Sequence, residues 1–148
     1  MNSFVITNNL FWCPDMCFDR ILIDGAWHKP SCAAGAAWVG VDSKGIQLAQ
    51  KQLSFFTHSA VVAEAQACLE ALKWCLQSHI KAITILTDCY ALITQLNDNS
   101  KAEWDIRHIL LDIKLLCKYF DHVYISKVPR RHVQAAHKAA QAASVKGC

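Results

Sequence analysis

The sequence predicts an α/β fold, a mixed five-stranded sheet with three antiparallel and two parallel strands and with helices on both faces. Three observations lead to this prediction. Three apolar stretches separated by turn-forming residues come first in the chain. Two more apolar stretches follow, and each comes after a segment whose apolar residues repeat with a helical period. Strands joined by tight turns pair antiparallel, whereas strands reached through helices pair parallel.

The first three strands are expected at residues 20–25, 33–41 and 46–56. The first is a short apolar run that ends at Asp24 and Gly25. Turn-forming clusters at 28–31 (His-Lys-Pro-Ser) and 42–45 (Asp-Ser-Lys-Gly) separate these strands from one another. Such short connections predict that the three strands are antiparallel neighbours.

The later elements are helices and strands in alternation. Helices are expected at 61–76, 90–96, 104–120 and 133–145, and strands at 82–88 and 122–128. The apolar face of the first helix comprises Val61, Ala65, Cys68, Leu69, Leu72, Cys75 and Leu76, and that of the long third helix comprises Ile106, Ile109, Leu110, Ile113, Leu116 and Cys117. Ser59 is suited to cap the first helix, and Pro129 ends the last strand.

Length and composition favour one folded domain. The chain has 148 residues, of which 53% are hydrophobic and 18% charged, and it contains no repeat or linker. We expect residues 1–18 to be a lead-in segment and residues 19–148 to be the domain. The formal net charge of +3 is compatible with a nucleic-acid partner but is too small to indicate one by itself.

The eight cysteines indicate neither a zinc site nor a disulfide scaffold. No two of them form a Cys-x-x-Cys pair, and the Cys13/Cys17 spacing has no matching partner pair. The first ten residues lack the features of a secretory signal, and no stretch reaches the roughly 18 apolar residues of a membrane span. We therefore expect reduced thiols in an intracellular protein, nuclear or cytoplasmic, with no membrane partner.

Three acids occupy suggestive positions. Asp24 and Asp88 each end a predicted strand, and Glu64 lies near the start of the first helix. If the two strands are neighbours, the three carboxylates converge, and hard divalent cations would then offset their repulsion. A single acid at such a position is usually a turn residue, a cap or a solvated helical residue. The prediction of a metal site depends on all three acids sharing one edge of the sheet.

These acids lie in motifs that resemble a known family. The motifs are Asp24-Gly25-Ala26-Trp27, Ala63-Glu64-Ala65-x-Ala67-x-x-x-Ala71 and Thr87-Asp88-Cys89, with Trp12-Cys13-Pro14 before them and Val128-Pro129-Arg130 after them. In this order and spacing they resemble ribonuclease H. The closer resemblance is to the plant reverse-transcriptase-like ribonuclease H domains, which also occur in non-LTR retroelements. The resemblance extends from about Trp12 to Ala143 and implies a ribonuclease H-like fold.

The resemblance also implies a function, which is hydrolysis of the RNA strand of RNA–DNA hybrids with two Mg²⁺ or Mn²⁺ ions held by four acids. Carried over by position, Asp24, Glu64 and Asp88 would be metal ligands, and Asp24 would bridge the two ions. The backbone of Gly25 and Ala26 would lie near the RNA strand and its 2′-hydroxyls.

The chain departs from the family pattern in its last helix. The family has Asn-x-x-Ala-Asp there, whereas this chain has Val133 in place of Asn and His137 in place of the fourth acid. Leu22 also stands where the subfamily often has Asn. His137 allows two interpretations. It is a metal ligand or proton-transfer group, better suited to Mn²⁺ than to Mg²⁺, or it marks a domain that has lost catalysis.

A basic run lies beside this position. Its members are Lys127, Arg130, Arg131, His132 and Lys138. We expect Arg130, Arg131 and Lys138 to contact phosphates, although a solvated surface is the common fate of such runs.

Four tryptophans allow more than one role. Trp27 and Trp38 are candidates for stacking on a base, but tryptophans in strands more often belong to the core. Trp74 and Trp104 are expected in the core or at an interface.

The leading hypothesis is therefore a metal-dependent endoribonuclease acting on RNA–DNA hybrids, slower and more dependent on Mn²⁺ than a four-acid enzyme. The alternative is a catalytically silent module that binds nucleic acid or a protein. A 3′–5′ exonuclease of related fold is disfavoured because its first motif needs Asp-x-Glu, and Asp24 is followed by Gly25 and Ala26. The sequence leaves the oligomeric state open.

Overall fold

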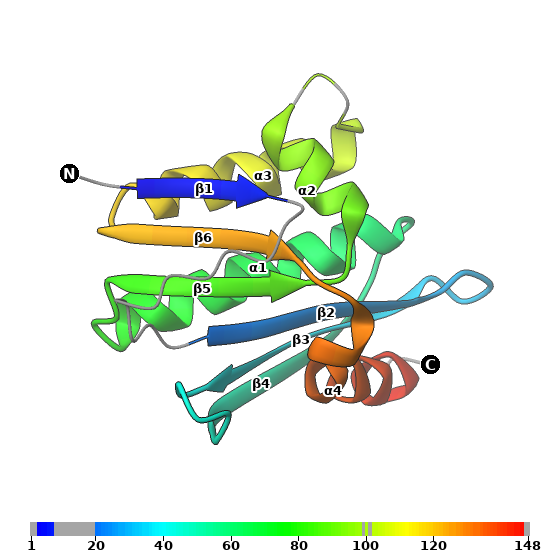
Figure 1. The fold of residues 1–148 in the computed structure, drawn as a ribbon. Coiled ribbons are helices and arrows are strands. Elements are labelled where there is room, and N and C mark those ends of the chain that lie inside the picture. Colours follow the sequence, from blue (N-terminus) through cyan, green and yellow to red (C-terminus); the bar gives the residue numbers. More distant parts are fainter. Residues whose placement is uncertain (1–2, 8–19, 99, 101, 147–148) are drawn as a thin grey trace.

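A computed structural model describes residues 3–7, 20–98, 100 and 102–146. A mixed six-stranded sheet is its centre, with strand order β1-β6-β5-β2-β3-β4 (Figure 1). The strands are β1 (Ser3–Thr7), β2 (Arg20–His28), β3 (Ala33–Val41), β4 (Gln47–Phe56), β5 (Ala82–Thr87) and β6 (His122–Lys127). The Trp12–Pro14 motif and the boundary between residues 18 and 19 lie outside the described residues.

The five strands expected from the sequence are confirmed, as are their directions. β2, β3 and β4 pair antiparallel, whereas β5 and β6 run parallel to β2. β1 adds a sixth strand, which pairs parallel with β6 in the register Val5↔Tyr124. β1 was not expected from the sequence, because its five residues show no clean period. The division into lead-in and domain stays a prediction.

Helices cover both faces of the sheet, as expected. They are α1 (Ala60–Gln77), α2 (Tyr90–Asn97), α3 (Trp104–Cys117) and α4 (Gln134–Lys146), with the short 3-10 helix η2 (Arg130–His132) before α4. α1 and α3 pack together on one face, and α4 lies on the other (Figure 1). Two glycines permit this close packing. A Cβ atom on Gly25 would lie 2.5 Å from the Glu64 amide nitrogen in α1, and one on Gly35 would collide with the Ala140 carbonyl in α4.

Some local expectations need correction. β2 does not end at Gly25 but continues to His28, because it stays paired with β3 from Asp24↔Ala37 to His28↔Ala33. α3 ends at Cys117, three residues earlier than expected. Ser59 occupies the N-cap position of α1 but makes no side-chain capping hydrogen bond there.

The core lies mainly between the sheet and the α1/α3 layer. Cys68 and Cys75 are fully buried in α1, as expected, and both are free thiols. Cys32, Cys89 and Cys117 are also free, whereas Cys13, Cys17 and Cys148 lie outside the described residues. Within the described part of the chain, no helix combines the length and the apolar character needed to cross a membrane.

Candidate active site

The fold brings the three predicted acids together. Parallel pairing of β2 with β5 reaches Leu22↔Leu86, so Asp24 and Asp88 each lie two residues beyond the same pair. Asp24 is therefore inside β2 rather than at its end, at the point where β2 and β5 separate. The close approach of α1 to Gly25 adds Glu64. Oxygen atoms of the three carboxylates lie within 4.8 Å of one another.

The cluster combines burial with like charge. Asp24 is 1% exposed and Glu64 7% exposed. The pKa of Glu64 is raised well above its usual value, first by burial and then by the neighbouring Asp24 carboxylate, and the Gly25 backbone opposes this only in part. Thr87 donates a long hydrogen bond of 3.5 Å from Oγ1 to Glu64 Oε2. Ionising Glu64 in this buried position beside Asp24 is unfavourable, so Glu64 favours either a retained proton or a bound cation.

Asp24 has one satisfied oxygen and one unsatisfied oxygen. His137 Nδ1 lies 2.6 Å from Asp24 Oδ2. Among the described residues, the buried Oδ1 atom of Asp24 has no hydrogen-bond partner. α4 carries His137 to this position because it packs on β2 and β3 over Gly35. Since Nδ1 faces Asp24, only Nε2 of His137 is left for another ligand.

Asp88 also has a partner, which the sequence patterns did not predict. Arg130 Nε in η2 donates a hydrogen bond of 2.8 Å to Asp88 Oδ2. This bond raises the pKa of the Arg130 guanidinium further. The sequence placed Arg130 near the site but suggested only a phosphate contact. A residue 42 positions from Asp88 gives no local signal of such a pair.

The other predicted contacts stay predictions. Arg131 and Lys138 are exposed, as is His132, whereas Lys127 is half-buried. Gly25 is required for the packing of α1, which by itself accounts for glycine at this position. Ala26 pairs with Gly35.

The tryptophans divide between core and surface. Trp38 is 2% exposed and its ring lies 4.6 Å from that of Trp74, so the core interpretation of Trp38 is confirmed and base stacking is excluded. Trp27 is half-buried and donates from Nε1 to the Thr57 carbonyl at 2.9 Å. Trp104 is 84% exposed, so the predicted core position is wrong for this residue, and its position at an interface stays a prediction.

Comparisons with known proteins agree with this architecture. The model of the family described as reverse transcriptase-like matches residues 22–143. No curated protein sequence matches the chain.

Several solved structures have the same fold. The N-terminal RNase H domain of Rv2228c from Mycobacterium tuberculosis superimposes with a TM-score of 0.80 at 19% identity, covering 89% of this chain and 96% of that one. RNase H1 from Halobacterium salinarum superimposes with a TM-score of 0.78 at 23% identity, covering 86% of this chain and 98% of that one. LC11-RNase H1, solved in complex with an RNA/DNA hybrid, superimposes with a TM-score of 0.76 at 20% identity, covering 86% of this chain and 97% of that one. At these identities the likeness establishes the fold.

Proposed function

The chain belongs to the reverse transcriptase-like family and has a ribonuclease H-like fold, and from this premise we propose that it is a metal-dependent endoribonuclease that cleaves the RNA strand of RNA–DNA hybrids. The observation that carries the proposal is the convergence of Asp24, Glu64 and Asp88 within 4.8 Å. Two of the similar structures, those of LC11-RNase H1 and of the foamy viral protease-reverse transcriptase, were solved in complex with an RNA/DNA hybrid, which supports the choice of substrate.

The donor set fits hard divalent cations. All three residues offer carboxylate oxygens, which Mg²⁺ and Mn²⁺ prefer. The buried, unpartnered Oδ1 of Asp24 is a polar atom that a cation would satisfy. We propose that Asp24, Glu64 and Asp88 would hold two such ions. Ions bound there supply an activated water and charge stabilisation for the leaving oxygen.

The remaining side chains orient the acids and the substrate. The Nδ1 atom of His137 contacts Asp24, so Nε2 is the atom of His137 that could bind a metal ion or transfer a proton. Arg130 holds Asp88. Arg130, Arg131 and Lys138 lie on or next to the elements that flank the cluster and are proposed to bind phosphates of the hybrid. The Gly25–Ala26 backbone is proposed to face the RNA strand.

A cleavage assay tests this function. An end-labelled RNA–DNA hybrid is incubated with the full chain in Mg²⁺ and in Mn²⁺, with Asp24→Asn as the site variant and Lys44→Ala as a distant surface control. We expect cleavage of the RNA strand, faster in Mn²⁺, which Asp24→Asn abolishes and Lys44→Ala leaves intact. Folded protein that cleaves in neither metal contradicts the proposal.

A second candidate function is favoured by one observation. His137 replaces a fourth acid and is already bonded to Asp24, which removes one negative charge from the site. A site with weaker attraction for a second ion would suit a module that binds hybrids without cutting them. Binding without turnover, together with cleavage by His137→Asp, would favour this candidate.

A further inference from the structure

Helix α3 is apolar on two opposite faces. Its inner face buries Ile106, Ile109 and Ile113 in the core. On the outer face, Trp104 is 84% exposed, Leu111 53% and Leu115 52%. A helix at the surface of a globular protein ordinarily presents polar residues to solvent. The outer face of α3 therefore has the composition of a surface that is covered by another element.

The spacing on this face is that of a helix–helix contact. Trp104, His108, Leu111 and Leu115 of α3 and Lys118, which directly follows the helix, are separated by four, three, four and three residues, and we call this set the outer seam. Three of its five members are apolar, and apolar residues with this spacing pack against a second helix in coiled-coil geometry. The seam thus indicates a helical occupant rather than a flat sheet or a small ligand.

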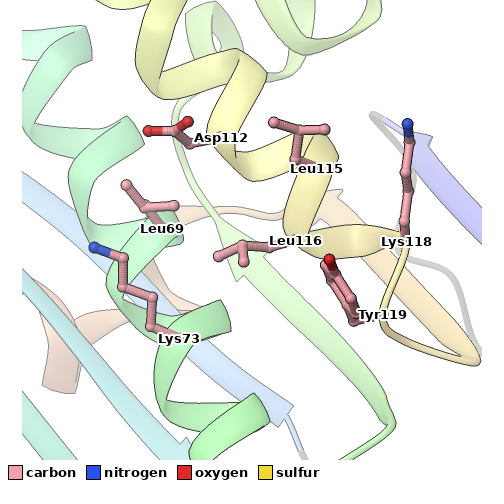
Figure 2. Close-up of a pocket in the computed structure, with 7 residues that line it drawn as sticks. All are labelled: Leu69, Lys73, Asp112, Leu115, Leu116, Lys118 and Tyr119. Atoms are coloured by element: carbon pink, nitrogen blue, oxygen red, sulfur yellow. The ribbon is translucent and has the colours of Figure 1, made fainter.

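A hollow beside the outer seam widens the apolar surface. It has a volume of about 570 Å³ and lies between α1 and the end of α3 (Figure 2). Leu69 lies on its α1 side, and Leu115, Leu116 and Tyr119 line the other side. Tyr119 is itself 68% exposed. Exposed apolar surface that continues from a helix into a hollow is typical of interaction sites.

The charges beside the outer seam identify the occupant. Arg107 and Lys114 lie along one flank, and Asp105 and Asp112 lie along the other. When two such helices run parallel about a twofold axis, the basic flank of each faces the acidic flank of the other. Arg107 of one copy then meets Asp112 of the second, five residues further along, and the pair occurs twice. An antiparallel pair would place like charges together.

We propose that the chain forms a twofold dimer in which the outer seams of two α3 helices pack in parallel. This proposal does not depend on catalysis. The helix spans only two heptads, so the interface is small and the dimer is expected to be weak. The test therefore covers protein concentrations from about 1 to 100 µM.

Sedimentation velocity of the full chain across this concentration range tests the proposal. We expect a reversible monomer–dimer equilibrium, which Leu111→Asp weakens at least about tenfold because it places a charge at the seam centre. Leu48→Asp is the matched control, since Leu48 is a leucine with 54% exposure in β4, the strand at the edge of the sheet opposite β1, whereas α3 lies on the side of β1 and β6 (Figure 1). A monomer at all concentrations, or equal weakening by both variants, overturns the proposal.

Charge reversal tests the parallel arrangement. Arg107→Glu and Asp112→Lys should each weaken the dimer, and the double variant should restore it, because each copy then carries both reversed partners. Lys44→Glu controls for net charge. The Arg107 Nε also donates to the Ala102 carbonyl at 3.0 Å, so thermal melts of every variant accompany the series. A folded double variant that stays monomeric overturns the parallel arrangement.

Discussion

His137 Nδ1 and Asp24 Oδ2 lie 2.6 Å apart, although 113 residues separate them in the sequence. This contact joins α4 to the centre of β2 at a carboxylate that is 1% exposed. His137, which stands where the family has its fourth acid, is therefore in direct contact with the acidic cluster. It provides a partner for Oδ2 of Asp24, whereas the buried Oδ1 has no hydrogen-bond partner among the described residues.

Removing the imidazole should destabilise the protein. His137→Ala leaves Asp24 buried with no partner at Oδ2, which should lower the free energy of unfolding by about 1–3 kcal/mol. Urea denaturation without metal measures this. Lys138→Ala changes an exposed neighbour on the same helix and should have little effect. Equal effects of the two variants would contradict the role assigned to His137.

Restoring the fourth acid should have opposite effects on stability with and without metal. His137→Asp replaces a hydrogen-bond donor by another negative charge beside Asp24, so the metal-free melting temperature should fall. Mn²⁺ should then raise the melting temperature more than it does in the wild type. Thermal melts across a Mn²⁺ titration measure both shifts. An unchanged Mn²⁺ response would show that the added carboxylate does not face the ions.

Arg130 should compete with a metal ion for Asp88. Arg130→Gln removes an ion pair whose arginine side chain is 59% exposed and which is worth about 0.2–1 kcal/mol, so Mn²⁺ binding without nucleic acid should tighten by up to about fivefold. Binding of the hybrid should weaken in the same variant because a phosphate contact is lost. Calorimetry measures the first effect and fluorescence anisotropy the second. Arg131→Gln should affect only the hybrid, because Arg131 is exposed and does not pair with Asp88.

Glu64 should make the metal-free protein less stable as pH rises. Its pKa is higher in the folded state than the ordinary 4.5, so between these two values the folded state holds more protons than the unfolded state. The free energy of unfolding therefore falls as pH increases above about 4.5 and levels off above the raised pKa. Glu64→Gln should reduce this slope, as measured by urea denaturation across pH. A slope of the same size in the variant would assign the effect to another group.

Gly25 should tolerate no side chain. A Cβ atom there would lie 2.5 Å from the Glu64 amide nitrogen, so Gly25→Ala forces α1 away from β2 and should cost about 1–3 kcal/mol. Gly40→Ala is the matched control, since its Cβ would meet Trp74 at an ordinary 3.7 Å. Urea denaturation compares the two. A stable Gly25→Ala protein that loses only hybrid binding would favour direct contact of this backbone with RNA.

Much of the fold could be read from local patterns. Alternating apolar runs and helical stripes predicted five strands and four helices, and tight turns or intervening helices predicted their directions. Asp24, Glu64 and Asp88 could be grouped because parallel strands end at one edge of a sheet. These predictions succeed because periodicity, turn chemistry and connection length act over a few residues.

Only the tertiary structure decided the rest. It extends β2 past Asp24, adds β1 to the sheet, pairs Arg130 with Asp88 and His137 with Asp24, and leaves Trp104 exposed. Each of these features depends on which distant segments pack together. Side-chain pairs of that kind carry no periodic signal in the sequence. The sequence by itself therefore determined the scaffold and the acidic cluster, and packing of η2 and α4 against the sheet decided how the charges of that cluster are balanced.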